Sequence, residues 1–234
     1  MKIQDFFAES FYINLDRRTE RRAMFEAEMA RVGLSDFVKR YPAAIDATHL
    51  PQDDYNRHRA CGQSQYNLIK YAADKGLPNI LIFEDDAYFY DAGNKPGLSI
   101  VEAALDSMSK IPAWDLFYLS CTPIFDALPP RPAPYHVDEH LVRVYGVLTG
   151  HAWAINHTAY ENLLLYNPAT DAAFDGCLSN NFELVKYMAY PLAVPQRAGP
   201  SDCDAYGYAS GDFSQTYARL AAELAANANN GEQP

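Results

Sequence analysis

The chain has 234 residues, of which 49% are hydrophobic and 21% charged, a globular composition that can form a sizeable core. Its formal net charge is −11, and so acidic a chain lacks the basic surface of a nucleic-acid-binding protein. The four cysteines are widely spaced and form no CxxC pair, which argues against a zinc site or a disulfide framework.

The N-terminal stretch "MKIQDFFAESF" lacks the long apolar region of a signal peptide. No apolar run reaches the length that crosses a bilayer. We therefore expect a cytoplasmic protein without a transmembrane segment, which contacts a membrane only peripherally if its substrate is linked to lipid.

In chain order, predicted strands alternate with predicted helices over the first half of the sequence. This alternation indicates an α/β fold with a mainly parallel central sheet flanked by helices. Asp16 or Thr19 is expected to cap the first helix, and Gly33 and Gly76 to end the first two. Apolar runs predict strands at 11–15, 37–41, 79–83 and 114–119, and helical spacing predicts helices at 16–32, 61–75 and 99–110.

The second half of the chain is more irregular. Its proline-rich stretch 123–140 is predicted to be a long surface loop. After it we expect one or two strands within 141–155, a short helix at 156–166 capped by Thr158, an edge strand at 190–196 and a helix at 213–227. No linker divides the chain, so we predict a single domain over 1–234.

A cluster of acids follows the third predicted strand. In "NILIFEDDAYFY" the apolar run ends in Glu84, Asp85 and Asp86, where ligands bind in open α/β sheets if the strand is parallel. Carboxylates this close repel one another, and a Mg²⁺ or Mn²⁺ ion carrying a phosphate group would remove that cost. The alternative is a solvated strand end or a helix cap.

A cluster of arginines follows the first predicted strand. "NLDRRTERR" contains Arg17, Arg18, Arg21 and Arg22, a residue type suited to bidentate binding of phosphate. The alternative is a solvated basic helix face, with Arg22 paired to Glu26. An acid cluster and an arginine cluster at neighbouring strand ends suit a metal-bound diphosphate lying between them.

These motifs resemble those of glycosyltransferase family 25, which includes bacterial lipooligosaccharide and collagen galactosyltransferases. The resemblance is carried by "FYINLDRRTERRAMFEAEM", "ACGQSQYNLIKYA", "ILIFEDDAYF", "GVLTGHAWAINHTAYENLL", "AFDGCLSN" and "QRAGPSDCD", in that order over about residues 9–205. Three features depart from the family pattern: Ser64 is followed by Gln65 instead of His, Cys61-Gly62 reverses the usual order, and Trp153 stands where the family often has Tyr.

The resemblance implies a GT-A type nucleotide-diphospho-sugar transferase fold. The implied reaction is a metal-dependent, inverting transfer of a hexose, most often galactose from UDP-galactose, to a saccharide or other hydroxyl acceptor in cell-surface glycan synthesis of the lipopolysaccharide type. The nucleotide-sugar-binding half would span about 9–122 and the acceptor half about 141–212. We expect a disordered tail at 229–234.

The resemblance also implies roles for individual residues. Asn14, Arg17 and Arg21 would bind the donor, with Glu84 and Asp85 reaching its ribose or sugar hydroxyls. Asp86 and Asp202 would hold Mn²⁺ or Mg²⁺. Asp175 would be the catalytic base, unless it only caps a helix that starts near Leu178.

Two other functions fit the same residues. The chain can be a catalytically inactive protein of this fold that binds a nucleotide sugar or a carbohydrate, a reading that the altered Ser64-Gln65 pair favours. It can also be a metal-dependent phosphohydrolase, although no nucleophile motif supports that alternative.

Overall fold

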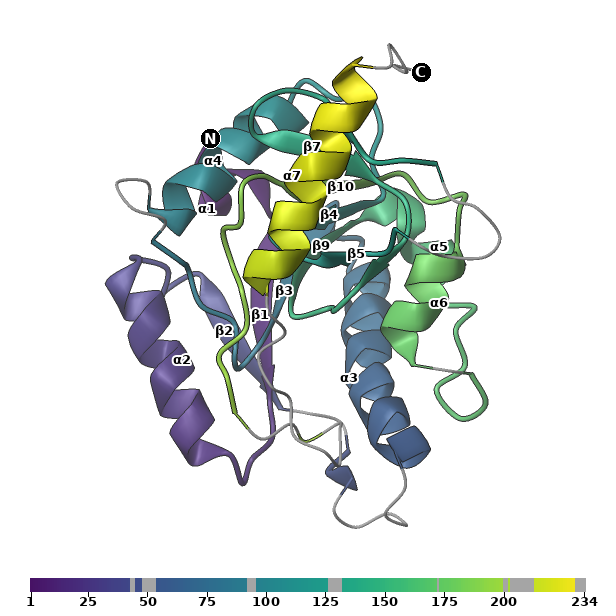
Figure 1. Cartoon of the computed structure of the whole chain (residues 1–234). Helices are drawn as coiled ribbons and strands as arrows, with labels where there is room; N and C mark the ends of the chain where they lie inside the picture. Colours follow the sequence, from purple (N-terminus) through teal and green to yellow (C-terminus); the bar gives the residue numbers. More distant parts are fainter. Residues whose placement is uncertain are drawn as a thin grey trace.

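A central β-sheet with helices on both faces organises the chain in the computed structural model (Figure 1). The structure describes residues 1–42, 45–47, 54–91, 96–125, 132–171, 173–199, 202 and 213–229.

Within these residues, the sheet has eight strands in the order β2-β1-β3-β9-β4-β10-β7-β6, and a separate pair joins β5 to β8. Following the pairings, six of the eight strands run in one direction, with β9 and β7 against them. The strands are β1 Glu9–Asn14, β2 Val38–Pro42, β3 Asn79–Glu84, β4 Leu116–Tyr118, β5 Thr122–Pro123, β6 Tyr135–His136, β7 Leu141–Val144, β8 Val147–Leu148, β9 Ala152–Asn156 and β10 Lys186–Ala189.

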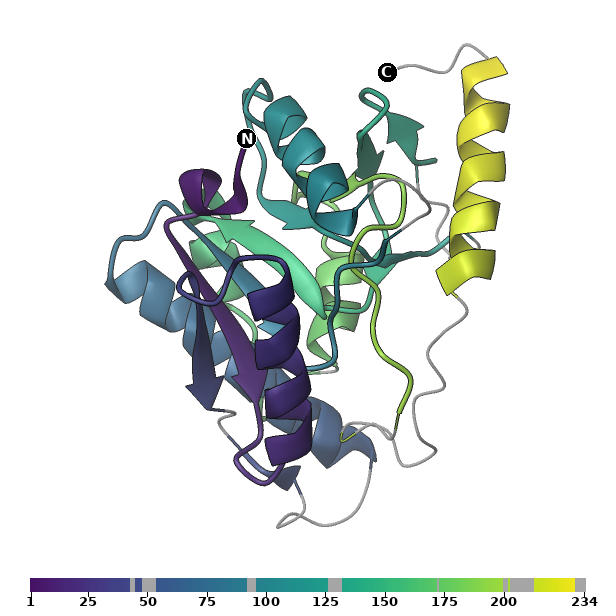
Figure 2. The ribbon, with the colours of Figure 1, turned by 90° about the vertical axis from the view of Figure 1, so that its left-hand side faces the viewer.

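Two layers of helices cover the two faces of this sheet, as the two perpendicular views show (Figures 1 and 2). Residues of α1, α2 and α4 share one buried apolar cluster, and residues of α3, α5, α6 and α7 share another. The predicted α/β class, with a mainly parallel central sheet flanked by helices, is confirmed. The helices are α1 Ile3–Phe6, α2 Thr19–Arg31, α3 Asp54–Asp74, α4 Gly97–Met108, the 3₁₀ helix η2 His157–Ala159, α5 Tyr160–Leu163, α6 Phe174–Asn180 and α7 Phe213–Asn229.

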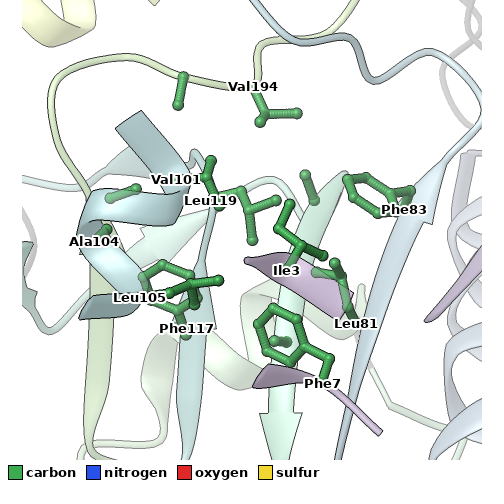
Figure 3. Packing of buried hydrophobic residues seen from close by; sticks show 14 of the residues in the cluster. Ile3, Phe7, Leu81, Phe83, Val101, Ala104, Leu105, Phe117, Leu119 and Val194 are labelled. Atoms are coloured by element: carbon green, nitrogen blue, oxygen red, sulfur yellow. The ribbon is translucent and has the colours of Figure 1, made fainter. Parts of the chain in front are cut away.

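Strand β3 lies in the middle of this core. Ile80 and Ile82 belong to the cluster on the α3 face, whereas Leu81 and Phe83 belong to the cluster on the α1, α2 and α4 face (Figure 3). All four side chains are fully buried. A strand that is covered on both faces has a continuous apolar run in its sequence, which is what Ile80 to Phe83 shows.

Different features mark the two ends of the first long helix, α2. Its N-cap is Arg18, whose side chain makes no capping hydrogen bond, so the predicted cap by Asp16 or Thr19 is wrong. At its other end Gly33 has a φ of +74°, and the Leu34 N–H donates to the Met29 carbonyl at 2.8 Å. The predicted stop at Gly33 is confirmed, because glycine adopts this left-handed conformation without steric cost.

Three other predictions need correction. Helix α3 begins at Asp54, well before the start at residue 61 that the sequence predicted. Thr158 does not cap its helix: its hydroxyl donates to the Asp115 carboxylate at 2.6 Å. No regular strand forms over 190–196, where Pro191 and Pro195 lack the N–H groups that a sheet requires. The strand in this region is β10, which lies between β4 and β7.

Several predictions fall partly outside the described residues. Within the proline-rich stretch, β5 and β6 are short strands, and 126–131 are not described. Of the predicted tail, only the end of α7 at Asn229 is described. Across the described ranges, no helix is long and apolar enough to span a membrane. Strand β9 lies between β3 and β4, so the two predicted halves of the chain share one sheet.

Candidate functional site

A pocket of about 320 Å³ lies at the carboxyl ends of β1 and β3. This is the edge of a parallel sheet at which α/β proteins bind ligands. All eight site residues predicted from the sequence line it: Asn14, Arg17, Arg21, Glu84, Asp85, Asp86, Asp175 and Asp202.

The register between β1 and β3 determines which residues form the floor of the pocket. Ile13 of β1 pairs with Glu84 of β3, so Asn14 and Asp85 follow at neighbouring strand ends. The Asn14 side-chain amide donates to Asp85 Oδ2 at 2.7 Å, and Arg40 of β2 donates to the Asn14 amide oxygen at 3.0 Å. Arg40 therefore fixes which end of the amide faces the acid.

Arg21 occupies the centre of the acid cluster. Its Nε lies 2.9 Å from Asp85 Oδ1, its Nη2 pairs with Asp86 Oδ2, and its Nη1 lies 3.4 Å from Asp202 Oδ2. The Arg21 side chain is only 17% exposed. From the sequence, the repulsion between these adjacent carboxylates suggested that they bind a metal ion. In the structure, the guanidinium group of Arg21 offsets this repulsion.

Three arginines converge on Asp202. Arg18 binds its carboxylate through two nitrogens, with Nε–Oδ2 at 2.8 Å and Nη2–Oδ1 at 2.9 Å. The Arg17 Nη2 donates to Asp202 Oδ1 at 2.6 Å. Arg22 points elsewhere and pairs with Glu26 at 2.9 Å, so for this one arginine the solvated-face alternative is correct.

The pocket shifts the pKa values of its acids in opposite directions. Burial, and then the neighbouring charge of Asp86, raise the pKa of Glu84 to about 8. Burial also raises the pKa of Asp85 to about 6, against the opposing effects of Arg21 and Asn14. For Asp202 burial acts in the same direction, but the hydrogen bonds from Arg18 and Arg17 outweigh it and its pKa is lowered.

These pairings decide how well the cluster suits a metal ion. Among the described residues, no group of three or more His, Cys, Asp or Glu side chains is placed to hold one. Both oxygens of Asp202 face guanidinium groups, and Asp86 faces Arg21 and Gln196. As arranged, the donor set does not fit Mn²⁺ or Mg²⁺. The roles of Asp86 and Asp202 as metal ligands stay predictions. For an ion to bind there, both carboxylates would have to replace their contacts with Arg21 by bonds to the ion.

Asp175 lies on another wall of the pocket, in the first turn of α6. Its Oδ2 accepts a hydrogen bond from the Thr149 N–H at 3.2 Å, and its Oδ1 accepts one from the Gly176 N–H at 2.8 Å. The N-cap of α6 is Ala173, so Asp175 does not cap a helix starting near Leu178. Its charge contributes to the raised pKa of Glu84.

Two further residues contact the acids of the pocket, although the sequence predicted no role for them in the site. The Gln196 amide donates to Glu84 Oε2 at 3.4 Å and to Asp86 Oδ1 at 3.3 Å. The Cys61 thiol lies 3.7 Å from Glu84 Oε1.

At Gly62 an added Cβ would lie 2.3 Å from the Tyr166 hydroxyl, so the close approach of α3 to that side chain requires glycine. Cys61, Cys121 and Cys177 form no disulfide with one another, and Cys203 lies outside the described residues.

Comparison with known proteins adds little to this geometry. No protein-family model and no curated protein matches the chain. A glycosyltransferase involved in the glycosylation of the major capsid of PBCV-1 is similar in structure, with 10% sequence identity, 92% of this chain and 98% of that chain covered, and a TM-score of 0.47.

A UDP-glucose pyrophosphorylase complexed with UDP-glucose gives 8% identity, 92% and 80% coverage, and a TM-score of 0.44. The mannose-1-phosphate geranyltransferase from Thermus thermophilus gives 12% identity, 77% and 73% coverage, and a TM-score of 0.42. These TM-scores are too low for the likenesses to indicate a shared activity.

Proposed function

We propose that this protein is a hexosyltransferase that uses a nucleotide sugar. Its substrate would be UDP-galactose, and its acceptor a hydroxyl group of a saccharide in cell-surface glycan synthesis of the lipopolysaccharide type. The observation that supports this most is the convergence of all eight predicted residues, from both ends of the chain, on one pocket. The sequence motifs supply the reaction class, and the pocket supplies groups with the chemistry that it needs.

The positive side of the pocket suits the diphosphate of the donor. Arg17 and Arg21 line the pocket, and Arg18 adjoins them through its contact with Asp202. These three guanidinium groups already hold one anionic side chain, and guanidinium forks match phosphate oxygens. Stabilising the diphosphate as it leaves is electrostatic catalysis by groups that are already in place. Asn14, Glu84 and Asp85 lie beside them and offer hydrogen bonds to ribose or sugar hydroxyls.

Asp175 is the proposed catalytic base. In an inverting transfer, the acceptor oxygen bonds to the anomeric carbon, the bond from that carbon to the diphosphate breaks, and the acceptor proton passes to a carboxylate. Two backbone N–H groups orient the Asp175 carboxylate at the pocket wall. A fixed orientation is what general base catalysis requires of such a group.

The proposed reaction is tested by following UDP release from UDP-galactose with an acceptor mixture. Asp175→Asn should lower the turnover number by about 10²–10⁴-fold, the range that general acid–base catalysis contributes. Asp106→Asn, on the exposed surface of α4, is the control and should leave turnover unchanged. Equal turnover in the wild type and Asp175→Asn would contradict the role of Asp175.

The same assay examines the predicted metal. If Asp86 and Asp202 hold Mn²⁺ or Mg²⁺, EDTA and Asp86→Ala should each abolish turnover. Full activity in EDTA would remove the ion from the proposal and leave Arg21 as the positive group beside Asp86.

A non-catalytic nucleotide-sugar-binding protein is the second candidate. It is favoured by the departures at Cys61-Gly62 and Ser64-Gln65, since Ser64 and Gln65 are buried at the pocket wall. It predicts saturable binding of the donor without turnover on any acceptor.

A further inference from the structure

The carboxylate of Asp202 is held as a bound anion would be held. It accepts hydrogen bonds from Arg17, Arg18 and Arg21 at 2.6–3.4 Å. Arg18 grips it with two parallel N–H donors, which is the fork geometry that guanidinium groups form with carboxylate and phosphate alike. These four nitrogen-to-oxygen contacts are more than is required to fix one aspartate side chain.

The surroundings of this carboxylate favour an anion in general. The Asp202 side chain is 16% exposed, and those of Arg17, Arg18 and Arg21 are 38%, 20% and 17% exposed. The N-terminus of α2 lies at Thr19, between Arg18 and Arg21, and no side chain caps it. Its dipole adds further positive potential at the same place.

We propose that Arg17, Arg18 and Arg21 form a diphosphate-binding site whose internal occupant is the Asp202 carboxylate, and that a diphosphate binds by taking over the hydrogen bonds that Asp202 receives. The inference rests on the proposed function for the identity of the diphosphate as part of a nucleotide sugar. It assigns Asp202 a competing role rather than that of a metal ligand.

This arrangement makes the site selective. An anion that enters must displace a carboxylate from the same chain, whose effective concentration at the arginines is high. An anion with a single weak charge displaces Asp202 from the arginines poorly. A diphosphate displaces it more readily, because it has more charge and more acceptor oxygens. The apparent affinity for any anion is the intrinsic affinity multiplied by the fraction of molecules in which Asp202 does not occupy the site.

The test is calorimetric titration with inorganic pyrophosphate in EDTA, where no metal contributes. Asp202→Asn should bind pyrophosphate about tenfold or more tightly than the wild type, and should bind inorganic phosphate measurably. The matched control is Asp46→Asn, because Asp46 also pairs with Arg17, at 2.6 Å. This control should change the affinity by less than about threefold. Arg18→Gln added to Asp202→Asn should cancel the gain.

Unchanged or weaker binding of pyrophosphate by Asp202→Asn in EDTA would overturn the proposal. If this variant does not fold, Asp202→Ser is measured in its place. Weaker binding that appears only in the presence of Mn²⁺ would assign Asp202 to a metal instead. Pyrophosphate binding needs neither sugar nor transfer, so tighter binding without turnover of any nucleotide sugar would refute the proposed function and leave this inference standing.

Discussion

At the scale of single residues, the pocket depends on Arg21. Its guanidinium lies between Asp85, Asp86 and Asp202 and explains how a buried strand can run directly into adjacent acids. The sequence showed both the acids and the arginines, and it indicated that the acids needed a positive partner. It did not show that the two clusters pair with each other, because that contact joins residues 65 positions apart.

Glu84 gives the pocket a measurable pH dependence. Its pKa is about 8 in the folded protein and near 4.3 in an unfolded chain. Between these values the folded state binds a proton that the unfolded state has released, so the free energy of unfolding falls as pH rises. For one proton the slope reaches about 1.4 kcal/mol per pH unit. Urea denaturation of the wild type and Glu84→Gln, in EDTA from pH 6.5 to 8, measures the difference.

Relative to the wild type, Glu84→Gln should gain stability steadily over this range. Glu26→Gln is the control, because hydrogen bonds from Tyr12 and Arg22 lower the pKa of Glu26 and it stays ionised throughout. A constant difference between wild type and Glu84→Gln from pH 6.5 to 8 would show that Glu84 titrates normally.

At the scale of elements, strongly patterned segments were predictable and mixed ones were not. The run Ile80 to Phe83 identified β3 because both of its faces are buried. Strand β10 was missed because its first residue is Lys186, and a lysine seldom starts a fully buried strand. The edge strand was predicted instead at the apolar residues that begin at Tyr190, although Pro191 and Pro195 prevent regular strand pairing there.

Lys186 shows why β10 tolerates a buried charge. Its side chain is fully buried, and its Nζ donates to the carbonyls of Tyr145, Leu178 and Asn181 at 2.5–3.0 Å. The last two lie at the C-terminal end of α6, where a positive charge is favourable. Lys186 thus fixes the helix that carries Asp175 to the sheet.

Replacing Lys186 should loosen α6. Lys186→Met keeps the length of the side chain but leaves three carbonyl groups, one buried and two partly buried, without this donor. The expected cost is about 3 kcal/mol in the free energy of unfolding. Lys70→Met is the control, since Lys70 is exposed and pairs with Asp74 of the same helix. It should cost less than about 0.5 kcal/mol. Equal losses for the two variants in urea denaturation would contradict the role of Lys186.

At the scale of the whole molecule, the fold brings distant segments to one edge of the sheet. Parallel β1 and β3 set the floor of the pocket, α3 and α6 add walls, and Asp202 reaches the N-terminus of α2. The ordered motifs of the sequence predicted which residues would meet. Their partners Gln196 and Arg40 were not predictable, because no local pattern marks a polar side chain that only long-range packing brings into contact.

The most direct test of the central claim, that this pocket binds the diphosphate of a nucleotide sugar, is a thermal-shift measurement. A ligand that binds only the folded state raises the melting temperature. UDP-galactose and UDP should raise it in the wild type, uridine should not, and Arg18→Gln should reduce the rise. No change in melting temperature with any nucleotide sugar, with or without Mn²⁺, would contradict the claim.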